Sequence, residues 1–151
     1  MNRWVLLIAG VLGIGVVLAQ VAGLSENIQG YTNWTRLNIN KVTKAGPHAG
    51  VRDVYINLKP DQLLGADGQP KFPLPAGTLI VKESSDPNTL SVTTLYVMQK
   101  KSDKPGDWAW GMFERKSNQF MGGTLTNPAM CVGCHQNSKN TDWTYTTYEK
   151  R

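Results

Sequence analysis

The segment "CVGCH" at residues 131–135 holds both cysteines of the chain and one of its two histidines, close to the C-terminus. No other feature restricts the fold as strongly, because the preceding chain must enclose whatever these three side chains bind. A structural zinc ion would need four ligands, and only three nitrogen or sulfur candidates lie here. A redox C-x-x-C needs the βαβ surroundings of a thioredoxin, which the neighbouring sequence does not provide. Both of these uses of paired cysteines are therefore disfavoured.

The spacing matches instead the C-x-x-C-H attachment signature of c-type haem. Two thiols separated by two residues reach the two vinyl groups of one macrocycle, and the next histidine ligates the iron as a proximal histidine does. The sequence therefore predicts one covalently attached haem c, bound by Cys131 and Cys134, with His135 as the iron ligand. Small electron-transfer cytochromes of the usual kind carry this motif near the start of a helical chain, whereas here it lies near the end.

Length and charge narrow the function further. The chain has 151 residues, which fits one domain. The net charge of +5 comes from basic residues scattered along the sequence, without the basic run of a nucleic-acid-binding surface. We therefore expect no nucleic-acid partner.

The N-terminus has the pattern of a secretory signal or a membrane anchor. Arg3 precedes an apolar stretch over residues 4–24, and the next charged residue is Glu26. As a helix the stretch would extend roughly 31 Å, close to a bilayer hydrocarbon core of about 30 Å. This length favours an uncleaved anchor, although small residues at Val17 and Ala19 also fit a cleavage site. In both cases Arg3 on the cytoplasmic side directs the rest of the chain to the periplasmic side of a bacterial inner membrane.

The chain accordingly divides into a signal peptide or transmembrane anchor, residues 1–24, and a haem c domain, residues 25–151. Most of that domain is predicted to form strands, because apolar and polar residues alternate with period two. The strand segments are 50–58, 77–84, 90–101 and 107–114. The last two flank "SDKPGD", whose Pro105-Gly106 pair predicts the turn of a hairpin.

A helix is predicted before the strands. Within residues 25–44, Tyr31, Trp34 and Leu37 are spaced for one helical stripe, with Ser25 as the cap. We therefore predict an α+β fold: a mainly antiparallel β-sheet with flanking helices and a C-terminal haem c attachment segment, preceded by an N-terminal apolar helix.

Seven segments occur in the order typical of the cytochrome P-460 family, which the chain resembles over about residues 31–147. They are "YTNWTRLN", "HAGVRDVYIN", "LPAGTLIVKE", "LYVMQKK", "GDWAWGMFE", "CVGCH" and "DWTYT". The resemblance implies an α+β fold, a single five-coordinate haem c and, commonly, a homodimer. The "GTLIVKE" strand together with a late C-x-x-C-H motif carries most of it.

The resemblance also implies roles for residues outside the motif. In members that oxidise hydroxylamine to nitrous or nitric oxide, the lysine of "VKE" is covalently linked to the haem ring, and that lysine is Lys82 here. Cytochromes c-prime-beta share the fold, lack the cross-link and bind nitric oxide or carbon monoxide in an apolar pocket. Arg52, just before "VYI", would lie near the distal face. Without the resemblance, Lys82 reads as a solvated strand lysine and Arg52 as a partner of Asp53 or Asp61 on the surface.

Oxidation of hydroxylamine also removes protons, so a distal carboxylate would help as a general base. The hydroxylamine-oxidising relatives have an acid shortly before the haem motif, but residues 115–130 contain no Asp or Glu. Glu114 would take this role if it faces inward with Trp108, Trp110 and Met112, with which it shares a strand face by the period-two rule.

Phenylalanines are available to line an apolar pocket of the kind that suits a bound gas. They are Phe72, Phe113 and Phe120. The sequence by itself does not place them on either side of the sheet.

Three functions stay open. The first is a hydroxylamine oxidoreductase with Lys82, Arg52 and Glu114 as catalytic residues. The second is a c-prime-beta-like protein that binds nitric oxide or carbon monoxide. The third is an electron-transfer subunit of a larger membrane complex, six-coordinate through His48 or a methionine, although "KAGPHAG" favours an ordinary loop histidine. The expected partners are a small molecule, namely hydroxylamine, nitric oxide or carbon monoxide, and a redox partner protein. The protein is expected to be a homodimer or a subunit of a membrane complex.

Overall fold

The computed structural model describes residues 21–145 and 148–150 of the chain. Most of the predicted apolar helix falls in residues 1–20 and so lies outside the described residues. Within the described ranges, no helix combines the length and apolar character needed to cross a membrane.

One antiparallel sheet of eight strands forms the body of the protein, with a few short helices around it. The strands are β1 (Thr35–Arg36), β2 (Val42–Lys44), β3 (Gly50–Arg52), β4 (Val54–Ile56), β5 (Leu79–Ser85), β6 (Val92–Lys100), β7 (Trp108–Lys116) and β8 (Gln119–Thr124). The α-helices are α1 (Pro60–Leu63) and α2 (Ala129–His135), and the 3-10 turns are η1 (Glu26–Ile28), η2 (Tyr31–Asn33) and η3 (Gln136–Thr141). The predicted α+β fold is confirmed.

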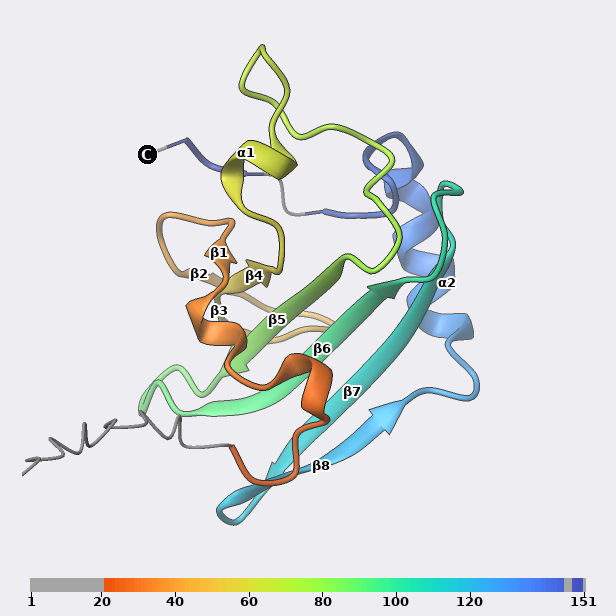
Figure 1. The fold of residues 1–151 in the computed structure, drawn as a ribbon. Coiled ribbons are helices and arrows are strands. Elements are labelled where there is room, and N and C mark those ends of the chain that lie inside the picture. Colours follow the sequence, from red (N-terminus) through yellow and green to blue (C-terminus); the bar gives the residue numbers. More distant parts are fainter. Residues whose placement is uncertain (1–20, 146–147, 151) are drawn as a thin grey trace, which may run out of the picture.

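The strands follow the order β1-β4-β5-β6-β7-β8, and β3 pairs with both β2 and β5. In Figure 1 the long central strands β5, β6 and β7 run side by side. The predicted hairpin is present as β6 and β7, in register from Lys100 opposite Trp108 to Thr94 opposite Glu114. Gly106 takes a positive φ of 73° in its turn, a conformation that glycine adopts without strain.

The helix predicted within residues 25–44 is wrong. This segment forms the turns η1 and η2 and the strands β1 and β2. Gly30 takes a positive φ of 68° and separates the two turns, and Ser25 makes no side-chain cap. Tyr31 and Leu37, expected on one stripe, join the clusters on opposite faces of the sheet. A spacing of three residues suits 3-10 turns as well as an α-helix, so the stripe did not discriminate between them.

Two further details differ from the sequence-based expectation. The single strand expected over residues 50–58 is split into β3 and β4 at Asp53, whose carbonyl accepts a hydrogen bond from the Glu83 amide. The strand β8 was not predicted, and it pairs with β7 through a turn at Ser117.

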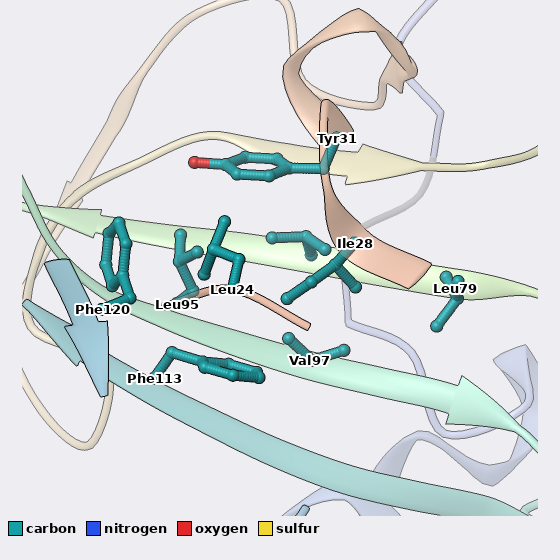
Figure 2. Packing of buried hydrophobic residues seen from close by; sticks show 9 residues of the cluster. Leu24, Ile28, Tyr31, Leu79, Leu95, Val97, Phe113 and Phe120 are labelled. Atoms are coloured by element: carbon teal, nitrogen blue, oxygen red, sulfur yellow. The ribbon is translucent and has the colours of Figure 1, made fainter. Parts of the chain in front are cut away.

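The alternation along β5 gives the sheet two different faces. Leu79 and Val81 belong to a core cluster with the N-terminal segment, whereas Ile80 belongs to the cluster on the other face. Figure 2 shows Leu24 and Ile28 lying against side chains of the sheet on the first face. We call this the N-terminal face.

The opposite face, which we call the α2 face, carries the second core cluster. Trp108 and Trp110 are buried there, and Cys131 of α2 packs against them. Phe113 and Phe120, considered as pocket residues, belong instead to the N-terminal face, because strand alternation turns them away from α2. Phe72 packs on the α2 face.

Candidate functional site

The helix α2 carries the three residues of the C-x-x-C-H motif. Asn127 accepts a hydrogen bond from the Ala129 amide and so satisfies one backbone donor where the helix begins. Positions three and four residues apart lie on one side of an α-helix, so Cys131, Cys134 and His135 face the same way. The two thiols are free rather than joined in a disulfide. Local helical geometry therefore presents two thiols and an imidazole together.

His135 is oriented by the chain that follows it. Its Nδ1 donates a hydrogen bond to the carbonyl oxygen of Trp143 at 2.7 Å. A histidine that donates from one ring nitrogen keeps the other as a lone-pair donor for a metal, here Nε2. Burial lowers the pKa of His135, against the opposing effect of this hydrogen bond. The neutral ring is the form that ligates a metal.

A buried ion pair holds the segment around Trp143. The carboxylate of Asp142 lies 2.7 Å from the ammonium of Lys100, and the exposed fractions of the two side chains are 1% and 0%. Asp142 also accepts hydrogen bonds from the amides of Leu74 and Gly106, and its carbonyl accepts one from the indole of Trp108. This network fixes the carbonyl that orients His135.

Two aromatic rings flank the imidazole of His135. The Trp110 ring centre lies 4.7 Å away and the Tyr145 ring centre 5.2 Å away, both edge-to-face. The hydroxyl of Tyr145 donates to the carbonyl of Cys134. The proximal side of the site is thus packed, and its ligand has little rotational freedom.

Lys82 belongs to the same site. It lies on β5 opposite Val54 and Tyr96, with the parity of the α2 face. Burial is the main cause of the lowered pKa of both His135 and His48, and the positive charge of Lys82 acts in the same direction on both. The sheet therefore brings together residues that are more than fifty positions apart in the sequence.

Arg52 on β3 and Tyr96 on β6 act on each other electrostatically. Burial raises the pKa of Tyr96, the charge of Glu114 adds to this, and the charge of Arg52 opposes it. The Nε of Arg52 is buried without a hydrogen-bond partner, and Asp53 pairs instead with Arg36 and Lys41. Arg52 is therefore not the surface ion-pair partner of Asp53 that the sequence offered as an alternative.

Glu114 lies at the rim. It shares the strand face of Met112 and lies near Tyr96, whose pKa its charge raises. Its side chain is 48% exposed and forms an ion pair of 3.1 Å with Lys116. Glu114 is thus on the correct face but at its solvent-exposed edge.

His48 lies between β2 and β3, in the loop expected from the sequence, but its ring points into the site. The ring centre lies 4.1 Å from that of Tyr96 and 6.3 Å from that of His135. Its Nδ1 is buried without a hydrogen-bond partner. Burial, followed by the charge of Lys82, lowers the pKa of His48 to about 4.

These residues fit a covalently held haem. The thiols and the oriented imidazole belong to α2, whereas the buried nitrogens without a partner, His48 Nδ1 and Arg52 Nε, belong to β3 and the loop before it. Buried polar atoms without a partner are rare in proteins and indicate a missing neighbour. Among the described residues, no three His, Cys, Asp or Glu side chains are arranged to bind a bare metal ion.

A separate cavity of about 340 Å³ opens near Leu24 and Gly122, and no ionisable side chain lines it. It lies beside the N-terminal segment rather than beside His135. The chemistry of the protein is therefore assigned to the α2 face.

Sequence reasoning missed Tyr96, Trp143 and the Lys100–Asp142 pair. Tyr96 lies in an ordinary pattern of alternating strand residues. Trp143 acts through its backbone carbonyl. Lys100 and Asp142 act as a buried ion pair between two residues that are far apart in the chain. The sequence signals were the segments "LYVMQKK", which contains Tyr96 and Lys100, and "DWTYT", which contains Asp142 and Trp143; the resemblance includes both segments without giving these residues a role.

Comparison with known proteins identifies a family for the chain. Residues 28–146 match the family model described as Cytochrome P-460. The match includes every site residue named above. No curated protein matches the chain.

Proposed function

The chain belongs to the cytochrome P-460 family, and from that premise we propose that it is a c-type haem protein that oxidises hydroxylamine. Family membership supports a haem and its iron. The observation that supports the specific reaction is the position of Lys82, which is half-buried on β5 opposite Val54 and Tyr96, with the parity of the α2 face. A strand lysine with no role in the site would be expected to face solvent.

Cys131 and Cys134 attach the haem in this proposal. Each S–H adds across one vinyl double bond: the sulfur bonds to one carbon, the hydrogen moves to the other, and no electrons are gained or lost. His135 ligates the iron through Nε2, because Nδ1 donates to Trp143. The spacing of the three residues on α2 supports this assignment.

Lys82 would hold the haem through a bond from Nζ to a carbon of its ring. The bond would replace one N–H and one C–H, so two protons and two electrons would leave. An oxidant of the peroxide class accepts them, and one hydrogen peroxide becomes two waters. The amine reacts in its neutral form, because an ammonium has no lone pair for the new bond.

The reaction converts two hydroxylamines to one nitrous oxide and one water, with release of four protons and four electrons. When bound, the haem supplies an iron that accepts these electrons singly and passes them to a one-electron acceptor, a redox partner protein in the cell. Arg52 supplies N–H donors that orient the substrate oxygen. Tyr96 and Glu114 carry protons outward, since Glu114 lies at the solvent-exposed rim.

Export is part of the proposal. Haem attachment and a periplasmic acceptor both require a location outside the cytoplasm, and Arg3 followed by residues 4–24 supports an anchored or secreted protein on the periplasmic side of the inner membrane. A homodimer would also fit, as in other members of the family.

The test compares wild-type protein with Lys82→Met, and with Lys101→Met as the matched control. We expect a broad reduced Soret band shifted to the red, and hydroxylamine turnover with a one-electron acceptor, in wild type and in the control. Lys82→Met should give an ordinary c-type Soret band and lose turnover. An ordinary Soret band in wild type, with carbon monoxide binding and no turnover, would support the gas-binding alternative instead.

A further inference from the structure

His48 lies in the short loop between β2 and β3, and the two ends of this loop differ. His48 follows Gly46, which takes a positive φ of 99° and has open space around it. Beyond His48, the carbonyl of Ala49 accepts a hydrogen bond from the hydroxyl of Ser84, and Gly50 lies directly against the backbone of Ser85. The loop is therefore anchored to β5 after His48, whereas before His48 it contains a glycine at positive φ whose Cβ position is open.

The distance between the two imidazoles is the main observation. The ring centres of His48 and His135 lie 6.3 Å apart and the rings are almost perpendicular, at 84°. Two imidazoles bound to one metal have bonds of about 2 Å each and roughly 1.2 Å from nitrogen to ring centre, which places the centres roughly 6 to 6.5 Å apart. The observed separation equals that of two histidines on opposite sides of one iron.

The same distance excludes a substrate between the rings. A small molecule bound to iron and hydrogen-bonded to His48 adds a bond and a hydrogen bond of about 2.8 Å, so the ring centres would lie roughly 9 Å apart. His48 at 6.3 Å is too close for that arrangement. A distal histidine that merely contacts bound substrate would have to lie further out.

Two further contacts favour ligation. The Nδ1 of His48 is buried and has no hydrogen-bond partner, and either nitrogen of a neutral imidazole can bind a metal. The ring of Tyr96 packs edge-to-face on His48 at 4.1 Å and fixes its direction. The ring is thus held in the site with a nitrogen available.

We propose that His48 is the second axial ligand of the haem iron in the resting protein and leaves the iron when hydroxylamine or a gas binds. The proposal rests on the haem site assigned above, with His135 as the first ligand. Gly46 provides a conformationally permissive point for the displacement, and the contacts of Ala49 and Gly50 with β5 hold the other end of the loop. Access to the iron is therefore governed by the loop between β2 and β3.

The experiment uses the full-length haem-loaded protein, His48→Ala, and Pro47→Ala as the matched loop control. Ferric wild type and the control should be low-spin by electron paramagnetic resonance. His48→Ala should be high-spin and return to low-spin when imidazole is added. Carbon monoxide association with the ferrous protein should level off at high gas concentration in wild type, because His48 must leave first.

His48→Ala removes the departure of His48 from the iron, so carbon monoxide should associate about 10- to 1,000-fold faster than with wild type. The reason is that a minor conformation, here the one with His48 off the iron, is typically populated at about 0.1–10%. His48→Met gives a second, independent readout, because a His/Met pair raises the reduction potential while the iron stays six-coordinate. This variant keeps the proposal testable if the alanine variant does not fold.

A high-spin wild type with the same carbon monoxide kinetics as His48→Ala would overturn the proposal. That result would not affect the proposed oxidation of hydroxylamine, which is tested by turnover and by the Soret band of Lys82→Met. Conversely, a low-spin wild type without turnover would refute the proposed reaction and leave the ligation by His48 in place.

Discussion

Nδ1 of His135 donates a hydrogen bond to the carbonyl oxygen of Trp143 at 2.7 Å. The chain reaches this position through two consecutive residues with positive φ, Asp142 at 50° and Trp143 at 67°. Such a conformation costs of order 1–3 kcal/mol for each residue that is not glycine. The buried pair of Asp142 and Lys100 stabilises it, so a charge on β6 determines the orientation of a side chain on α2.

Asp142→Asn should destabilise the protein by about 3–5 kcal/mol, because Lys100 is left as an uncompensated buried charge. Urea unfolding of the haem-loaded protein measures the change. Lys100→Met combined with Asp142→Asn should recover part of the loss, since no unpaired charge remains. Lys116→Met, which breaks the exposed pair with Glu114, should change stability by less than about 1 kcal/mol. Equal effects of Asp142→Asn and Lys116→Met would contradict the role of the buried pair.

Cys131→Ala and Cys134→Ala should each leave one thioether, and the double variant should leave none. Haem staining after denaturing electrophoresis of protein matured in a periplasm distinguishes the three. The cross-link to Lys82 adds a condition: the double variant should still retain haem, and only Lys82→Met added to it should remove all of it. Loss of all haem in the double cysteine variant would show that Lys82 is not linked.

Glu83 should make stability depend on pH. Burial raises its pKa above the usual value, although the hydrogen bond from Tyr31 at 2.8 Å opposes this. A carboxyl with a raised pKa in the folded state contributes stability below its unfolded pKa, near 4.5, and loses that contribution as pH rises through the folded pKa. The free energy of unfolding should therefore fall from pH 4.5 upward, and the fall should be smaller in Glu83→Gln.

Tyr31→Phe provides the companion measurement. It removes the donor to Glu83 and leaves a buried carboxylate with an unsatisfied oxygen, which should cost about 1–3 kcal/mol at neutral pH. The loss should shrink at acid pH, where the carboxyl is protonated. A loss that is the same at both pH values would show that packing of the ring, not the hydrogen bond, is what Tyr31 contributes.

Gly106→Ala should disturb the site from the hairpin turn. A Cβ there would lie 2.5 Å from the Trp143 ring, and Gly68→Ala has the same φ of 73° with open space around it. Both variants incur the cost of a positive φ, and only Gly106→Ala should lose a further 1–3 kcal/mol or so from the clash. Thermal unfolding of the two variants measures this difference in stability. Matching losses would mean that Trp143 moves aside freely.

The sequence determined those parts that depend on neighbours along the chain. The residues Cys131, Cys134 and His135 are three and four positions apart, so any helix places them together. Alternation assigned Leu79 and Ile80 to opposite faces of one strand. Both results need only the local geometry of a helix or a strand.

Only the tertiary structure decided which distant residues meet at the α2 face of the sheet. The loop of His48 and the strand of Lys82 reach α2 because eight strands pair in one particular order. The helix predicted from the spacing of Tyr31, Trp34 and Leu37 was wrong, because a spacing of three residues fits both an α-helix and a pair of 3-10 turns. Local patterns specify the direction of a side chain, whereas long-range strand pairing and burial determine what that side chain meets.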